Sequence, residues 1–116
     1  MMINTSINQP ISHVLLKNYF ESLVNRFFKI LPMRENHEDS LPVYMKGLQA
    51  ELIGCKSFIP DFDSNSLYMS LLCILQYLID IPDCSVKDTK REVFGAISIC
   101  NKLAEIYGDM SVEVPR

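Results

Sequence analysis

Residues 66–81 read Ser-Leu-Tyr-Met-Ser-Leu-Leu-Cys-Ile-Leu-Gln-Tyr-Leu-Ile-Asp-Ile, and this stretch decides the fold. Twelve of its sixteen residues are apolar, and it lacks the continuous polar face of an ordinary surface helix. We expect a helix over about 65–81 that is central in the fold and largely buried, capped by Asn65 or Ser64 and ended by Pro82. The alternative is that part of this helix contacts another chain, because so short a protein has few elements to cover it.

The segment before Pro32 has an amphipathic pattern. From Ser12 to Leu31 apolar residues recur at helical spacing, and Lys, Asn, Glu and Ser residues share the opposite face. We predict a helix of about five turns that ends at Pro32, because proline disfavours helical geometry in the residue before it. Residues 33–39 are polar and have no periodicity, which is typical of a loop.

Two further helices are expected. One precedes the irregular segment 55–65, and the other follows the apolar stretch 66–81. The first is capped by Asp39 or Ser40, tolerates Pro42 in its first turn and ends at Gly54, a favourable C-cap residue. The second begins after Ser85, a favourable N-cap residue, and ends at Gly108.

These four helical segments are joined by short connections, which favour antiparallel neighbours. Alternation of apolar and polar residues at period two is nowhere sustained, so no strand is predicted. The sequence therefore predicts an all-α fold: one domain over 1–116, built as an antiparallel up-and-down four-helix bundle. Residues 1–10 and 109–116 are expected to be loose tails.

Composition narrows the classes of function. The 116 residues are 48% apolar and 22% charged, with a formal net charge of −3, as in an ordinary soluble domain. No basic run is longer than a pair, so binding to nucleic acid or to an anionic membrane is not expected. The apolar run is shorter than the roughly 20 residues of a membrane span. The first residues do not resemble a secretion signal, and we expect a cytoplasmic protein.

No motif points to catalysis or to metal binding. The four cysteines are widely spaced, without a nearby histidine, so we expect buried free thiols rather than a zinc site. Asp61-Phe-Asp63-Ser-Asn65 begins like a calcium loop, but the twelfth position of such a loop is Leu72, which cannot ligate. His37 has acidic neighbours but no nucleophile placed near it. We expect no enzymatic activity, no metal and no cofactor.

The preferred hypothesis is a small non-enzymatic interaction module that self-associates, as a homodimer, or docks on a partner protein. If the least hydrophobic strip of the third helix faces outward, two flanking apolar residues become anchors, because exposed apolar groups favour association. The partner-interface candidates are Met69, Leu72, Cys73, Gln76, Ile79 and Asp80.

The alternative hypothesis is an inhibitor or immunity-type protein that blocks an enzyme or a nuclease. Carboxylates of a small acidic domain can occupy the electropositive groove that receives a phosphate backbone. The candidates lie in two acidic loops: Glu35, Glu38 and Asp39 in one, and Asp61 and Asp63 in the other.

Two other groups of residues are candidates for binding. Lys87, Lys90 and Arg91 form a basic cluster in the first turns of the fourth helix, where cations oppose the helix dipole. This cluster indicates either an anionic partner surface or a solvated face that pairs locally with Asp88 or Glu92. A third hypothesis is a small-molecule pocket in the core, although aromatic residues at helical spacing are more often plain core; its lining would be Phe20, Phe27, Tyr68 and Tyr77.

Overall fold

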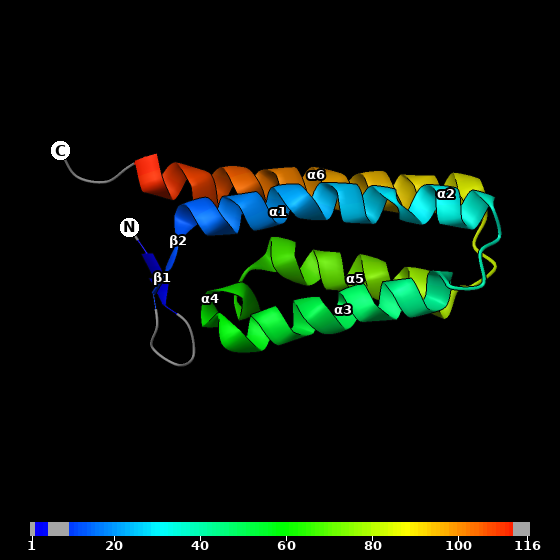
Figure 1. Cartoon of the computed structure of the whole chain (residues 1–116), viewed down its shortest axis with the longest axis horizontal. Coiled ribbons are helices and arrows are strands. Elements are labelled where there is room, and N and C mark those ends of the chain that lie inside the picture. Colours follow the sequence, from blue (N-terminus) through cyan, green and yellow to red (C-terminus); the bar gives the residue numbers. More distant parts are fainter. Residues whose placement is uncertain (1, 5–9, 113–116) are drawn as a thin grey trace.

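The computed structural model describes residues 2–4 and 10–112, with side chains over 12–108, and long antiparallel helices make up most of it (Figure 1). The prediction of an all-α four-helix bundle is confirmed, because α1 with α2, α3, α5 and α6 run alternately up and down. The helices are α1 (His13–Phe28), α2 (Ile30–Glu35), α3 (Leu41–Phe58), α4 (Pro60–Asp63), α5 (Ser66–Asp80) and α6 (Val86–Val112).

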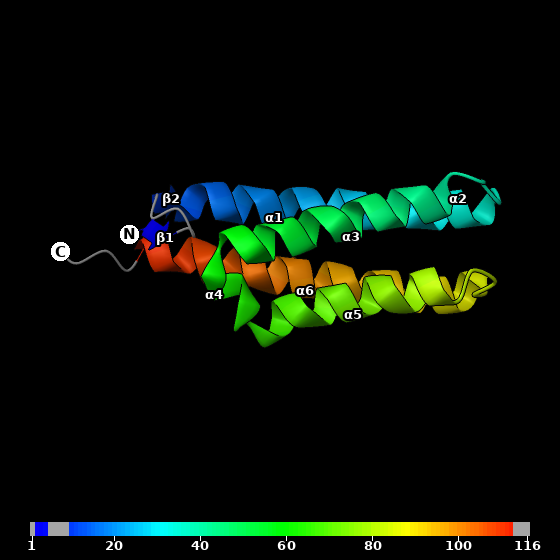
Figure 2. The ribbon, with the colours of Figure 1, turned by 90° about the horizontal axis from the view of Figure 1, so that it is seen from below.

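Four helical rods, namely α1 with α2, α3, α5 and α6, form a square arrangement. Figure 1 shows α1 beside α6 in one layer and α3 beside α5 in the other, and the view from below in Figure 2 places α1 next to α3 and α6 next to α5. The connections from α2 to α3 and from α5 to α6 lie at one end of the bundle. The short helix α4 lies at the opposite end, with the C-terminal part of α6.

A short strand pair occurs in the region where only a loose tail was expected. Strand β1 (Met2–Asn4) pairs antiparallel with β2 (Pro10–Ser12), which leads directly into α1. Strands of three residues are too short to produce a recognisable alternation in the sequence, and this explains why the pair was not predicted.

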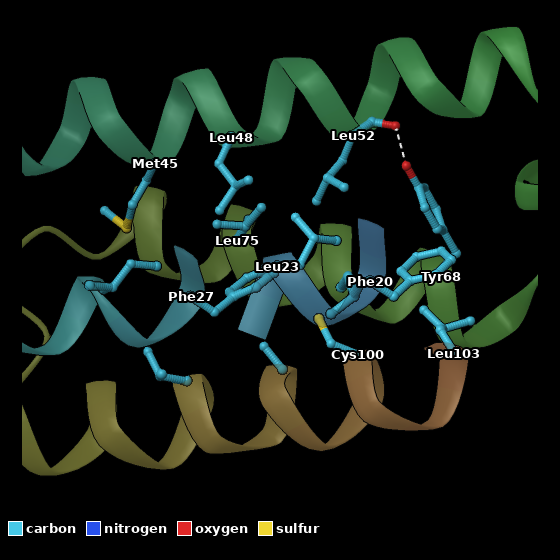
Figure 3. Close-up of a cluster of buried hydrophobic side chains, with 14 of the residues drawn as sticks. Phe20, Leu23, Phe27, Met45, Leu48, Leu52, Tyr68, Leu75, Cys100 and Leu103 are labelled. Atoms are coloured by element: carbon cyan, nitrogen blue, oxygen red, sulfur yellow. Dashed lines mark hydrogen bonds between the residues drawn. The ribbon is translucent and has the colours of Figure 1, made fainter. Parts of the chain in front are cut away.

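Buried side chains from all four rods meet along the axis of the bundle (Figure 3). Phe20 and Phe27 of α1 and Tyr68 of α5 are fully buried, and the Tyr68 hydroxyl donates a hydrogen bond to the Leu52 carbonyl of α3 at 2.6 Å. Tyr77, in contrast, is exposed. The four aromatic residues that the pocket hypothesis grouped together therefore do not line a common space.

Burial of α5 is one-sided. The helix packs against α3 and α6, so it is a wall of the bundle rather than an element wrapped on every side. A square bundle leaves each rod an outer face, and this is why even a helix of this apolarity keeps accessible residues. Its fully buried side chains are Tyr68, Leu71, Leu75 and Leu78; its exposed ones are Ser66, Met69, Cys73, Gln76, Tyr77 and Asp80.

The prediction that Pro32 ends the first helical segment is wrong, because Pro32 lies inside α2. A proline ring conflicts with the carbonyl four residues earlier, here that of Phe28. The helix is interrupted directly after this residue, at Lys29, and then resumes with the Met33 amide donating to the Lys29 carbonyl at 3.3 Å. The residues from Met33 to Glu35, expected in a loop, are therefore helical.

Gly54 and Gly108 also lie inside helices, contrary to the prediction that each ends one. α3 continues through Gly54 to Phe58, where Pro60 requires an extended Ile59 (φ −116°, ψ 96°). α6 continues through Gly108 to Val112, so residues 109–112 are helical and not part of a tail.

The predicted N-caps Asn65 and Ser85 are confirmed by their hydrogen bonds, whereas Ser40 precedes α3 without a side-chain capping bond. The Asn65 side chain accepts from the amides of Leu67 and Tyr68 at the start of α5. The Ser85 hydroxyl accepts from the Asp88 amide at 3.0 Å, at the start of α6. Each bond satisfies an amide that has no partner within its helix.

We expect Gly47→Ala and Gly54→Ala each to stabilise the protein by about 0.5–1 kcal/mol, because glycine loses more backbone entropy than alanine in a helix. Both glycines are exposed within α3, neither has a positive φ, and no atom lies within 4 Å of a Cβ built at either position. Urea unfolding of the double variant measures the gain. Unchanged or lower stability would contradict this packing of α3.

Candidate protein-interaction surface

The interface candidates on α5 divide into exposed and half-buried residues. Gln76 accepts from Gln49 of α3 at 2.7 Å and donates to Asp80 at 2.8 Å, so part of the strip is already hydrogen-bonded within the protein. Met69, with 36% of its surface exposed, is the main apolar group on it. In the structure Met69, Cys73, Gln76 and Asp80 face outward, and Leu72 and Ile79 flank them half-buried, which is the arrangement that the interface hypothesis requires.

The cysteine thiols differ in their surroundings. Cys84 and Cys100 are buried as predicted, and burial raises the pKa of the Cys100 thiol to about 12. Cys55 is half-buried. Cys73 is exposed, so the prediction of a buried thiol is wrong there, because this residue lies on the outer face of α5.

The two acidic loops lie at opposite ends of the bundle (Figure 1). Asp61 of α4 accepts a hydrogen bond from the Tyr107 hydroxyl at 2.5 Å, and Asp63 pairs with Lys56 at 3.0 Å. At the other end, Glu35 ends α2, while Glu38 and Asp39 are exposed in the connection to α3. The structure therefore does not combine the acidic candidates into one patch.

An apolar groove of about 330 Å³ lies between the junction of α1 with α2 and the beginning of α6. Phe28 of α1 and Phe94 of α6 meet edge to face in it, with ring centroids 6.2 Å apart. Their exposed fractions are 49% and 44%, which are large for side chains of this kind. We call this feature the Phe28–Phe94 groove; its lining is Phe28, Leu31, Pro32, Glu35, Val86, Lys90 and Phe94.

The sequence did not reveal this groove. In the sequence, Phe28 and Phe94 fall on the apolar stripes of their helices, a position that is typical of core residues. In the structure they lie at the outer edge of those stripes, because α1 and α6 pack through residues nearer the centre of each stripe. The one feature of the sequence that could have indicated the groove is the position of both phenylalanines at the edge of an apolar stripe.

The basic cluster adjoins the groove and divides into two parts. Arg91 is paired locally, with Asp88 at 3.4 Å and Glu92 at 3.3 Å, as the solvated-face alternative predicted. The Lys90 ammonium lies 5.8 Å from the centre of the Phe94 ring, a cation–π arrangement. Lys87 forms no ion pair with any side chain in the 12–108 range. Two cations therefore have no carboxylate partner: Lys90, which lines the groove together with Glu35, and Lys87, which follows the lining residue Val86.

A polar network links α1 to α3 on another side of the bundle. The Arg26 guanidinium donates to both Glu51 carboxylate oxygens, at 2.6 and 2.9 Å, and the Tyr19 hydroxyl donates to the same carboxylate at 2.6 Å. Hydrogen bonds from Arg26 hold the pKa of Glu51 below its usual range. The carboxylate is fully used in joining two helices, so we assign this network a structural role.

Over the described side chains, no group of three His, Cys, Asp or Glu residues is arranged to hold a metal ion. Within the described helices, none is both long and apolar enough to cross a membrane. Comparison of the chain with protein-family models, curated proteins and solved structures finds no match.

Proposed function

We propose that this protein is a non-enzymatic helical interaction module that docks on a partner protein through the Phe28–Phe94 groove. The observation that carries the proposal is the pair of half-exposed phenylalanines, which come from different helices and are continuous with the 40%-exposed Val86. Fully burying one phenylalanine contributes about 1.5–3 kcal/mol. Aromatic side chains in a depression are the usual anchors of protein interfaces.

The charges beside the groove indicate what kind of partner segment it receives. Lys87 and Lys90 have no carboxylate partner within the described residues, and their position at the start of α6 opposes the helix dipole. A partner segment with an apolar side chain flanked by carboxylates would fill the groove and neutralise both cations. Binding of an acidic partner segment would thus explain why these cations stand at the start of α6, where they oppose the helix dipole.

The inhibitor hypothesis has less support from the same surface. It requires acidic loops that act together, but these loops are at opposite ends of the bundle. The carboxylates of Asp61 and Asp63 are also engaged, by Tyr107 and Lys56 respectively. Glu38 and Asp39 alone make a small acidic surface.

Phe28→Asp with Phe94→Asp is expected to weaken partner binding by roughly 100-fold or more, because it places charges on two anchors of the interface. Both side chains are half-exposed, so the fold should survive, and the helical circular-dichroism spectrum checks this. A partner is first captured from an extract of the source cells on the immobilised wild-type protein. Its affinity for each purified variant is then measured.

Met69→Asp with Cys73→Asp on α5 is the matched control, because it places the same charges on another exposed part of the bundle. It should bind as the wild type does. Unchanged binding by the groove variant, or a loss confined to the α5 variant, would contradict the proposal. Light scattering after size-exclusion chromatography identifies the other source of partner: a wild-type dimer that the groove variant dissociates means a second copy of this chain.

A further inference from the structure

A second pocket, of about 470 Å³, opens at the same end of the bundle as the Phe28–Phe94 groove but on the side of α3 and α5. Its apolar lining includes Leu41 and Met45, which are almost fully buried, and the half-buried Ile79. Charged residues also line it, and all of them are exposed except Arg34 of α2. The deeper part of the pocket therefore combines an apolar surface with one guanidinium group.

The hydrogen bonding of Arg34 is incomplete. Its Nη1 atom donates to the Pro82 carbonyl in the connection between α5 and α6. Its Nε and Nη2 atoms are buried and have no partner among the described residues. The neighbouring carboxylates of Glu38 and Asp39 do not pair with it. Leaving charged donors unpaired in a shielded place is unfavourable, so a ligand that supplies acceptors gains this energy.

The two unpaired atoms define the kind of acceptor. Nε and Nη2 form the side-on edge of a guanidinium, whose two parallel N–H groups match the two oxygens of a carboxylate. Pockets of roughly 300–1,000 Å³ with apolar walls and a few polar groups are the usual sites of small ligands. Among the lining residues the cations Arg34 and Lys46 are matched by the carboxylates of Glu38 and Asp39, so the pocket has no excess positive charge that would favour a multiply charged anion over a monoanion.

We propose that this pocket binds a monocarboxylate with a short apolar body. The Nε and Nη2 atoms have no exposed surface, so the guanidinium rotates on binding and turns its side-on edge to the carboxylate, while Leu41, Met45 and Ile79 contact the apolar part. The carboxylate can belong to a free small acid or to the C-terminal residue of a peptide, since both present the same group. The proposal can be tested separately from the groove, because no residue lines both depressions.

The test is a titration of the full chain followed by amide chemical shifts in two-dimensional NMR spectra. Hexanoate represents a free acid, N-acetyl-leucine a peptide C-terminus, hexanamide the uncharged equivalent and inorganic phosphate a plain anion. We expect one or both carboxylates to shift pocket amides with a dissociation constant of about 1 mM. Hexanamide should bind about tenfold more weakly or worse. The tighter carboxylate identifies the source of the ligand.

Variants distinguish the pocket from unspecific binding. Arg34→Gln is expected to weaken the tighter carboxylate about tenfold or more, whereas Arg91→Gln, at an exposed arginine outside the pocket, should leave it unchanged. If the spectrum of Arg34→Gln shows a disturbed fold, Ile79→Trp fills the pocket instead and should abolish binding. The proposal is overturned if neither carboxylate binds, if phosphate or hexanamide binds as tightly, or if both pocket variants bind like the wild type.

Discussion

Phe20→Ala should lower the free energy of unfolding by about 3–5 kcal/mol, a large part of the 5–15 kcal/mol that stabilises a typical domain. Phe20 is fully buried, and its ring contacts those of Phe62, Tyr68 and Tyr107, with centroids 5.5, 6.2 and 5.6 Å away. These rings come from α4, α5 and α6 and also contact one another, so they cannot collapse into the space that the substitution creates. Urea unfolding followed by circular dichroism measures the loss.

Phe28→Ala provides the matched comparison, since it makes the same change on the same helix. Phe28 is 49% exposed, so its truncation should cost about 1 kcal/mol or less. Under the proposed function it should nevertheless weaken partner docking, which Phe20→Ala affects only through stability. Equal stability losses for the two variants would show that the core is not packed as described.

The protein should lose stability as the pH falls from about 7.5 to about 5, because of His13. This side chain is 1% exposed and is the first residue of α1. Burial lowers the pKa of His13 from its ordinary value of 6.5, and the Asp61 carboxylate partly opposes this. A positive charge at a helix N-terminus is also unfavourable. The unfolded chain therefore binds a proton more readily than the folded one, so the free energy of unfolding declines below about pH 6.5.

Melting temperatures across this pH range test the role of His13. His13→Leu should flatten the profile, whereas His37→Gln, at the exposed histidine after α2, should leave the slope unchanged. The Glu51 carboxylate does not contribute to the pH dependence in this range. Since its pKa is lowered, its contribution to stability is lost only below its ordinary value of 4.5. A flat wild-type profile, or a slope that persists in His13→Leu, would refute the role of His13.

Most of the fold could be predicted because it depends on local signals. The periodicity of apolar residues predicts the four long helices. The N-caps Asn65 and Ser85 could be identified because a capping side chain acts within one helical turn. Helix ends at glycine were predicted wrongly. A glycine such as Gly54 ends a helix only where the following residues gain nothing by continuing it. Here α3 goes on to Phe58 and leads to the buried Ile59, which packs in the core.

The candidate surface was harder to predict, because it depends on how distant segments pack. The strip of Met69, Cys73, Gln76 and Asp80 on α5 can be read from one helical wheel, but the wheel alone does not tell whether this strip faces outward. The groove instead needs Phe28 and Phe94 side by side, on the first and last long helices. The contact of Arg34 with the Pro82 carbonyl likewise joins α2 to the connection between α5 and α6, which no local pattern relates.

The short helix α2 separates the two depressions. Its consecutive residues Arg34 and Glu35 line the pocket and the groove respectively, and the single residue Lys29 joins it to α1. Six residues are too few for a helix to be stable on its own, so its position depends on what packs on either side. Any occupant of one depression that displaces α2 changes the affinity of the other, and linkage requires the same factor in both directions. A small acid that moves this helix would thereby become an effector of partner docking, and the partner would tune the uptake of the acid in return.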